Sequence, residues 1–178
     1  VYRQLLLKTP DSDTQGLIER DLARTFPSHQ LFRDTDGAGQ QSMRNILHAY
    51  NAVDPEVGYV QGMGFLVATL LTQMSEEETF WCFHEMMQQN LYAMRELFRP
   101  NFPMLQLCFF QLKKLMQLHC PKLLAHLDSQ GLDVSIFASQ WFMTLYVYHF
   151  PFRAVLRLWD IFLCEGWKII FRVGITLL

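Results

Sequence analysis

Apolar residues recur along the chain with the period of an α-helix rather than that of a β-strand. In residues 40–51 they follow the spacing i, i+3, i+4, i+7, as Met43, Ile46, Leu47 and Tyr50. Residues 79–87 also show helical spacing, with Phe80, Phe83, Met86 and Met87. Just before them, Ser75 and Glu78 form a capping box, in which Ser75 caps the helix and Glu78 reaches back. Both segments are therefore predicted to be helices that bury one apolar face.

Prolines and a glycine mark the limits of further helices. Pro103 precedes an apolar run that is predicted to end at Pro121. Pro151 precedes a run that is predicted to end at Gly166, where glycine suits a left-handed C-cap. Strand patterns are nearly absent, and no Asn-Gly or Asp-Gly pair joins two alternating runs. The sequence therefore predicts an all-α fold of some seven or eight helices.

The size and composition of the chain are those of a single globular domain. Of its 178 residues, 51% are hydrophobic and 18% are charged, which is too apolar for a disordered segment. The formal charge of −2 excludes the basic surface that grips a phosphate backbone, so no nucleic-acid binding is expected. The longest apolar runs, 62–74 and 141–152, are shorter than the about 20 residues that span a bilayer, so no direct membrane insertion is expected.

Neither the cysteines nor the histidines show the spacing of a metal site. The four cysteines are Cys82, Cys108, Cys120 and Cys164. They lack the C-x₂₋₄-C pairing of zinc sites, so we expect no metal and interpret them as reduced, mostly buried thiols. His84-Glu85 begins like H-E-x-x-H, but Gln88 stands where the second histidine is needed.

Other familiar signatures of binding and catalysis are missing as well. The chain has no G-x-x-x-x-G-K-[ST], G-x-G-x-x-G or G-x-S-x-G pattern, so it does not hold a nucleotide on a glycine-rich loop of its own. Aromatic residues are dense between Trp141 and Phe152. They could form a ligand pocket or stacking platform, but no lysine or arginine interleaves with them. An aromatic helical core is the favoured interpretation.

One segment with an unusual arrangement of polar residues is 18–27, Ile-Glu-Arg-Asp-Leu-Ala-Arg-Thr-Phe-Pro. The residues expected to anchor it to the core as a short helix are Leu17, Ile18 and Leu22. Asp21 and Arg24 are neighbours on one side of that helix because they lie three residues apart. Pro27 disfavours helix at Phe26, so the helix should end near Arg24. The pattern fits either an ordinary surface ion pair or an arginine that is held ready at a helix end.

The second such segment, residues 54–64, lies between two apolar helices and has three glycines within seven residues. Glycines so placed suit a positive φ or the close approach of a partner to the backbone. Gln61 stands at or just before the start of the following helix. Its amide could orient a water molecule, or it could simply cap the turn.

Together the two segments form a more specific pattern. Residues 18–24 match I-x-x-D-x-x-R, and residues 59–63 match Y-x-Q-G-M. With these motifs the sequence resembles the TBC-domain family of Rab-type GTPase-activating proteins. The resemblance continues through RTFPSHQLF at 24–32, ASQWFMTLYVYHFP at 138–151 and RLWDIFLCEG at 157–166. It is nearest to the subgroup whose members carry this domain beside long coiled coils.

The resemblance implies an all-helical, V-shaped TBC domain over residues 1–178, with a smaller N-terminal half that carries two catalytic fingers. Arg24 then corresponds to the family's arginine finger and Gln61 to its glutamine finger. The residues implied to support them are Asp21, Tyr59 and Gly62. The partner would be a Rab-type small GTPase in its GTP form, which itself holds GTP and Mg²⁺, so no cofactor of the chain's own is expected. A cytoplasmic protein that meets secretory or endocytic membranes transiently, through the lipidated Rab, is implied as well.

The sequence departs from the family pattern in two respects. Val60 stands where members often have cysteine, a change that points away from the reaction. An upstream Arg-x-x-Trp-like helix and part of the C-terminal end are missing, and the chain opens without methionine, so we expect a fragment truncated at both ends. Two alternatives remain open: a non-catalytic scaffold that binds a GTP-loaded Rab, and a helical interaction domain unrelated to GTPases.

Overall fold

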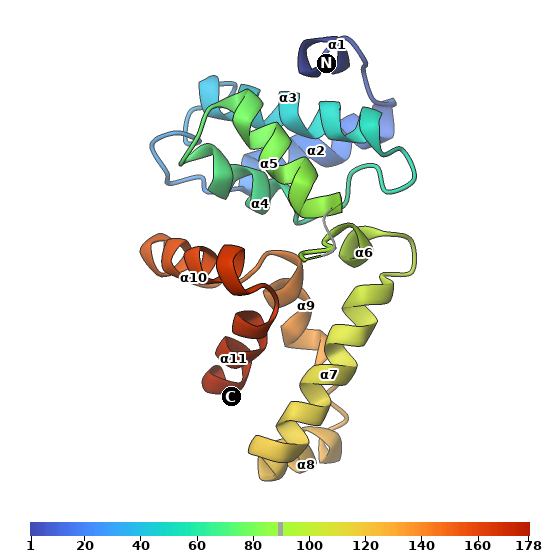
Figure 1. Cartoon of the computed structure of the whole chain (residues 1–178), viewed down its shortest axis with the longest axis vertical. Helices are drawn as coiled ribbons and strands as arrows, with labels where there is room; N and C mark the ends of the chain where they lie inside the picture. Colours follow the sequence, from blue (N-terminus) through green and yellow to red (C-terminus); the bar gives the residue numbers. More distant parts are fainter. Residues whose placement is uncertain (89–90) are drawn as a thin grey trace. The chain divides into compact units, whose positions relative to one another are not determined.

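The computed structural model describes residues 1–88 and 91–178 of the chain (Figure 1). The first six helices along the chain are α1 (Tyr2–Leu5), α2 (Ser12–Arg24), α3 (Ala38–Val53), α4 (Met63–Leu71), α5 (Glu76–Gln88) and α6 (Arg95–Phe98). Those of the C-terminal part are α7 (Pro103–His119), α8 (Pro121–Ser129), α9 (Ser135–Met143), α10 (Phe152–Glu165) and α11 (Lys168–Leu177). No described residue lies in a strand, so the predicted all-α fold is confirmed. Within the same residues, no helix has the length and apolarity to cross a membrane.

The described residues form eleven helices, more than the seven or eight that the sequence predicted. Two of the additional helices, α1 and α6, have four residues each, which is too short for an apolar period to show. The predicted break at Pro121 is confirmed, because α7 ends at His119 and Pro121 is the first residue of α8.

The chain forms two compact units, residues 1–95 and 96–178, and both predicted finger segments lie in the first. The N-terminal unit is the longer of the two in this chain, so the expectation of a smaller N-terminal half is wrong. In that unit α3 packs against α1, α2, α4 and α5, and α4 and α5 pack against each other (Figure 1). All nine residues of α4 are buried, so this helix forms the centre of the core. The two predicted apolar stripes are buried as expected: Met43, Ile46, Leu47 and Tyr50 on α3, and Phe80, Phe83, Met86 and Met87 on α5.

The predicted helix ends are only partly as expected. The Glu78 carboxylate accepts the backbone N–H of Ser75 at 3.0 Å and its hydroxyl at 2.6 Å, so Glu78 does reach back over the first turn of α5. At the C-terminal end of α10, Gly166 has a positive φ of 72°. Its ψ of −153° lies outside the left-handed helical region, so the predicted left-handed cap is wrong in ψ. Glycine is still suited to this position because L-residues rarely adopt such a φ.

In the second unit, α7 packs against α8, α9 and α11, and α10 packs against α11 (Figure 1). The dense aromatic segment contributes to this core, since Phe142 and Tyr146 are buried. The Tyr146 hydroxyl donates to the backbone oxygen of Ile170 at 3.0 Å and so joins α11 to the segment after α9. Tyr148 is an exception, because 54% of it is exposed.

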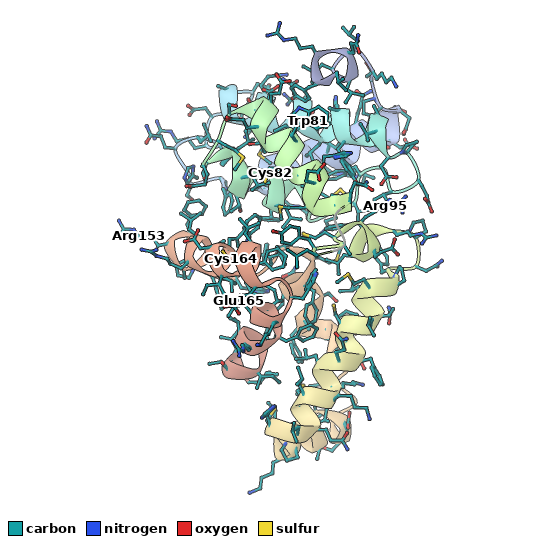
Figure 2. The ribbon with its side chains drawn as sticks, in the orientation of Figure 1. Trp81, Cys82, Arg95, Arg153, Cys164 and Glu165 are labelled. Carbon is teal, nitrogen blue, oxygen red and sulfur yellow. The ribbon has the colours of Figure 1, made fainter. Side chains whose placement is uncertain are left out.

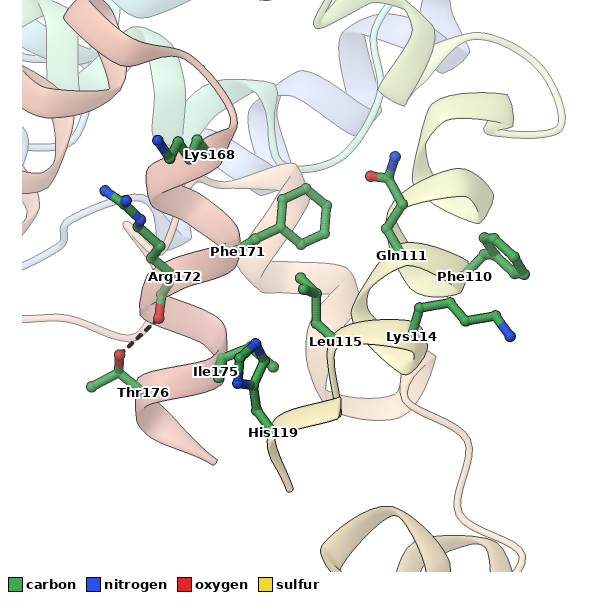
Figure 3. Close-up of a pocket in the computed structure, with 10 residues that line it drawn as sticks. All are labelled: Phe110, Gln111, Lys114, Leu115, His119, Lys168, Phe171, Arg172, Ile175 and Thr176. Atoms are coloured by element: carbon green, nitrogen blue, oxygen red, sulfur yellow. Dashed lines mark hydrogen bonds between the residues drawn. The ribbon is translucent and has the colours of Figure 1, made fainter. Parts of the chain in front are cut away.

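A groove of about 950 Å³ runs between α7 and α11 within the second unit. Figure 3 shows Phe171 and Leu115 pointing into it from the two helices. Lys114, Lys168 and Arg172 add positive charge to its lining.

Candidate functional site

Helix α2 carries Arg24 at its last residue and is fixed at both ends. At its start, the Asp11 carboxylate accepts the backbone N–H groups of Asp13 and Thr14 at 3.1 and 3.0 Å. Such an N-cap satisfies amides that have no partner within the helix. At its end, the buried Thr25 leaves the helical conformation and donates its hydroxyl to the backbone oxygen of Asp21 at 2.6 Å. The helix therefore ends at Arg24, as the position of Pro27 predicted.

Buried residues on one face of α2 hold it against the core of the first unit. Ile18 and Leu22 are 0% and 1% exposed. Leu17, also expected to be an anchor, is 43% exposed, so that prediction is wrong. Ile18 and Leu22 are four residues apart and share a face, whereas adjacent positions on a helix point about 100° apart.

The turn after α2 is held by a small aromatic cluster. Phe26 has a φ of 47°, outside the right-handed helical region as Pro27 predicted, but in the left-handed region that non-glycine residues rarely enter. Its ring lies 6.1 Å from that of Phe32 and 6.0 Å, edge to face, from that of Phe65 on α4. These contacts bring the C-terminal end of α2, and with it Arg24, close to the beginning of α4.

The loop between α3 and α4 carries Gln61. Two of its glycines have a positive φ, 61° at Gly58 and 107° at Gly62, and Gly62 is the N-cap of α4. Gln61 stands just before this N-cap and its side chain is exposed. Within residues 1–88 and 91–178, no hydrogen bond engages the Gln61 amide, so the structure does not show the capping role that the sequence left open.

The Asp21 carboxylate connects the C-terminal end of α2 with the loop before α4. One oxygen, Oδ1, pairs with the guanidinium of Arg24. The other, Oδ2, accepts the Tyr59 hydroxyl and the backbone N–H of Gly62, the latter at 3.3 Å. Gln61 is thus placed between two residues that bind the same carboxylate oxygen. Of the predicted site residues, Asp21, Arg24, Tyr59 and Gly62 are joined by direct contacts, and Gln61 is held between them through the chain.

The members of this cluster differ in how far they are buried. Only 4% of Asp21 is exposed, whereas 47% of the Arg24 side chain is accessible. Burial raises the pKa of the Tyr59 hydroxyl, and the hydrogen bond and charge of Asp21 raise it further. Tyr59 therefore remains a neutral donor to Asp21 at physiological pH. The backbone near Arg24 and Gln61 is thus fixed by buried contacts, while the side chains of both residues are exposed.

Two residues that hold the loop in place, Asp54 and Arg95, were not among the site residues that the sequence predicted. Asp54, the C-cap of α3, accepts the Arg95 guanidinium at 2.7 and 3.0 Å. Asp54 directly follows an apolar helix, which in retrospect suits a polar anchor, but nothing along the chain indicated Arg95 as its partner. In the described part of the chain, no three His, Cys, Asp or Glu side chains gather as a metal site would require.

Comparisons with known proteins match this architecture. Residues 2–178 match the family model of the Rab-GTPase-TBC domain. The chain is 45% identical over 177 residues to the human ecotropic viral integration site 5 protein homolog, covering 99% of this chain and 21% of that protein. It is 41% identical over 165 residues to the Caenorhabditis elegans Rab GTPase-activating protein tbc-11, covering 93% of this chain and 18% of that protein. The chain thus spans about a fifth of the length of these curated relatives.

Two solved structures share the fold. The Chlamydomonas flagellar RabGAP TBC domain is 28% identical, with a TM-score of 0.77 over 98% of this chain and 57% of that chain. The Ypt/Rab-GAP domain of Gyp1p has a TM-score of 0.80 at 24% identity, over 95% of this chain and 62% of that chain, a likeness of fold alone. With the match of the family model along nearly its whole length, this chain belongs to the Rab-GTPase-TBC domain family.

Proposed function

We propose that this chain is a GTPase-activating domain for a Rab-type GTPase in its GTP form. The observation that carries the proposal is the Asp21 carboxylate, which holds an accessible arginine and the base of an accessible glutamine in one cluster. Membership of the Rab-GTPase-TBC family, and a relative named as a Rab GTPase-activating protein, support the choice of partner.

Arg24 has the chemistry of a group that completes a phosphoryl-transfer site in trans. Charge develops on the transferring phosphoryl group and its leaving oxygen, and catalysis consists mainly of positioning and electrostatic stabilisation. A guanidinium is permanently charged, planar and able to donate two parallel hydrogen bonds to phosphate oxygens. Asp21 limits the positions of Arg24 in the free domain without enclosing it. On docking, the guanidinium would exchange part of this ion pair for contacts with phosphate.

Gln61 has the complementary chemistry, since its side-chain amide both accepts and donates hydrogen bonds. In the proposed complex it would accept from the attacking water and donate to a phosphate oxygen. The GTPase would hold GTP and Mg²⁺, so this chain would supply only side chains. Tyr59 and Gly62 would fix the backbone on either side of Gln61 so that its amide points outward.

Single-turnover GTP hydrolysis by a panel of purified Rab-type GTPases tests the proposal, with wild type, Arg24→Ala, Arg24→Lys and Gln61→Ala in parallel. We expect wild type to accelerate one or a few of them, and Arg24→Ala to lose about 10³- to 10⁵-fold of that acceleration, the range known for arginine fingers supplied in trans. Arg24→Lys should lose nearly as much, because an ammonium group lacks the planar fork. Gln61→Ala should still bind the GTPase but lose acceleration.

Arg157→Ala is a matched control. Arg157 also pairs with an aspartate three residues away on a helix, Asp160, at 3.8 Å, but lies in the second unit with 87% of its side chain exposed. Its replacement should leave acceleration unchanged. Full acceleration by Arg24→Ala would refute the assignment. Binding that depends on GTP, with no acceleration by wild type on any GTPase, would instead favour the non-catalytic scaffold.

A further inference from the structure

The loop that carries Gln61 is anchored at its far end by a second charged cluster, centred on Arg95. Arg95 is the last residue of the first unit and the first of α6, and it is labelled in Figure 2. Its Nε donates to Asp54 Oδ2 at 2.7 Å and its Nη2 to Asp54 Oδ1 at 3.0 Å. The same Nη2 donates to Glu56 Oε2 at 2.6 Å. One guanidinium thus binds two residues of the loop, one of them through both carboxylate oxygens.

Asp54 transmits this contact to the backbone of the loop. Besides Arg95, its carboxylate accepts the hydroxyl of the buried Tyr50 at 3.1 Å, and its backbone oxygen accepts the N–H of Gly58 at 2.8 Å. Burial would raise the pKa of Asp54, but the hydrogen bonds from Arg95, Tyr50 and the Val57 backbone outweigh it and lower that pKa. Asp54 is therefore an ionised group whose partners define the first half of the loop.

Residues 54–62 are held at both ends, and between the two anchors Pro55 and Glu56 are exposed while Val57 is buried. Arg95 and Tyr50 hold Asp54 at the beginning, and Asp21 holds Tyr59 and Gly62 at the end. A loop with both ends fixed has fewer conformations than one fixed at a single end, and its exposed residues lose less freedom on binding. Both anchors thus restrict the backbone of the loop that carries Gln61.

We infer that Arg95 is a positioning residue for Gln61, acting through Asp54 and the backbone of residues 54–62. This inference rests on the proposed function, in which Gln61 orients the attacking water. Misplacement of a reacting group by about 1 Å can cost about 100-fold in rate. Loss of the Arg95 contacts should therefore lower kcat more than it raises KM, because the Arg95 side chain is only 20% exposed and its loss acts on the placement of Gln61.

Arg44 offers a matched control within the same unit. It also binds one carboxylate through two nitrogens, that of Glu19, and a second one, that of Asp36, at 2.8 Å. The side chains of Arg44 and Arg95 are similarly buried, at 16% and 20% exposed. Among the residues that the structure describes, no hydrogen bond or ion pair of Arg44 involves residues 54–62. Arg44→Ala should therefore lower the melting temperature about as much as Arg95→Ala, without the same loss of kcat.

The experiment compares kcat and KM for GTPase acceleration by wild type, Arg95→Ala, Arg95→Lys and Arg44→Ala. We expect kcat to fall about ten- to hundredfold in both Arg95 variants, with KM changed less than threefold. Lysine should not rescue the rate, because it cannot bind both oxygens of Asp54 and Glu56 together. Should Arg95→Ala fail to fold, Arg95→Lys carries the comparison, since it keeps the positive charge.

A double-mutant cycle with Gln61→Ala separates positioning from general destabilisation. If Arg95 acts through Gln61, then Arg95→Lys should cost little further rate once Gln61 is alanine. Full additivity of the two losses would overturn the inference, as would wild-type kcat in both Arg95 variants.

Amide hydrogen exchange tests the same inference without a GTPase. The Gly58 and Gly62 amides should exchange at least about tenfold faster in Arg95→Lys than in wild type. In Arg44→Ala their exchange rates should equal those of wild type. Unchanged exchange at both glycines in Arg95→Lys would overturn the inference even if acceleration had fallen. If wild type accelerates no GTPase, the proposed function fails, while exchange still decides whether Arg95 orders the loop.

Discussion

The two oxygens of the Asp21 carboxylate bind different segments of the chain. Oδ1 pairs with Arg24 on the same helix, and Oδ2 accepts from Tyr59 and Gly62 of the loop. A carboxylate with 4% of its surface exposed has little contact with water, so its three donors provide the compensation that a buried charge requires. The motif I-x-x-D-x-x-R and the motif Y-x-Q-G-M thus meet at the side chain of Asp21.

The Tyr59 hydroxyl can be removed with little other change. Tyr59→Phe keeps the buried ring but leaves Asp21 Oδ2 with only the Gly62 amide, so we expect a loss of about 1–3 kcal/mol in the free energy of unfolding. GTPase acceleration should fall as well, because Tyr59 is two residues from Gln61. Chemical denaturation and the hydrolysis assay measure the two effects. Tyr148→Phe, at a side chain that is more than half exposed, should change stability by less than about 0.5 kcal/mol. A Tyr59→Phe variant as stable and active as wild type would contradict the role of this hydroxyl.

Among single residues, sequence reasoning succeeded where the geometry is local. The pairing of Asp21 with Arg24 follows from their spacing on one helix and is confirmed. That Tyr59 and Gly62 reach the same carboxylate depends on contacts across 38 and 41 positions, which helical spacing cannot predict. The Arg95–Asp54 contact, across 41 positions, was missed for the same reason.

At the scale of elements, the start of α4 determines where Gln61 stands. Gly62 is its N-cap with a φ of 107°, and its amide reaches back to Asp21. Helix α4 is entirely buried, so its first residue has little freedom to move. The sequence placed Gln61 at or just before this helix, and the structure confirms that position. It did not predict the very short helices α1 and α6 or the ψ of Gly166, since apolar periodicity says little about four residues or one dihedral angle.

Gly62→Ala should disturb this element in a defined way. An L-residue at φ 107° is strained, so we expect a loss of about 1–2 kcal/mol in stability and a fall in GTPase acceleration as the turn shifts Gln61. Gly131→Ala is the matched control, because Gly131 also has a positive φ, 66°, with no atom within 4 Å of an added Cβ, and lies in the second unit. Gly131→Ala should also lose stability, because a positive φ is costly for an L-residue, but it should accelerate GTP hydrolysis as well as wild type does. Equal activity of both variants would show that the turn at Gly62 does not position Gln61.

At the scale of the whole molecule, every residue assigned to the proposed site belongs to the first of the two compact units, residues 1–95. The boundary between the units follows Arg95, inside helix α6. A boundary within a helix leaves no polar or proline-rich linker, which is why nothing in the composition marks it. Apolar patterning predicts that helices form and which faces they bury, whereas the division of their contacts between two units is a property of the tertiary structure.

The four cysteines are distributed over both units, and their reactivity tests the packing of the chain. Cys164, labelled in Figure 2, is exposed, Cys82 and Cys120 are half-buried, and Cys108 is buried. All four are free thiols, and burial raises the pKa of Cys108 to about 12. A thiol reacts as its thiolate, so Cys108 is both covered and protonated at neutral pH. When the native chain is titrated with a thiol reagent, the exposed Cys164 should therefore react fast, and the buried Cys108 should react only on unfolding. Raising the pH from 7 to 9 should not release the slow group, because pH 9 is still far below its pKa.

The fast reaction should be absent from Cys164→Ser and present in Cys108→Ser. In denaturant without a reductant, all four thiols of the wild-type chain should react. If fewer than four thiols reacted, the chain would contain a disulfide, whereas all four cysteines are free in this structure. A fast reaction of Cys108 in the native chain would mean that α7 does not pack in solution as it does here, since the pKa of that thiol is raised by burial alone. Because α7 packs against α8, α9 and α11, the reaction rate of this one buried thiol reports on the integrity of most of the second unit.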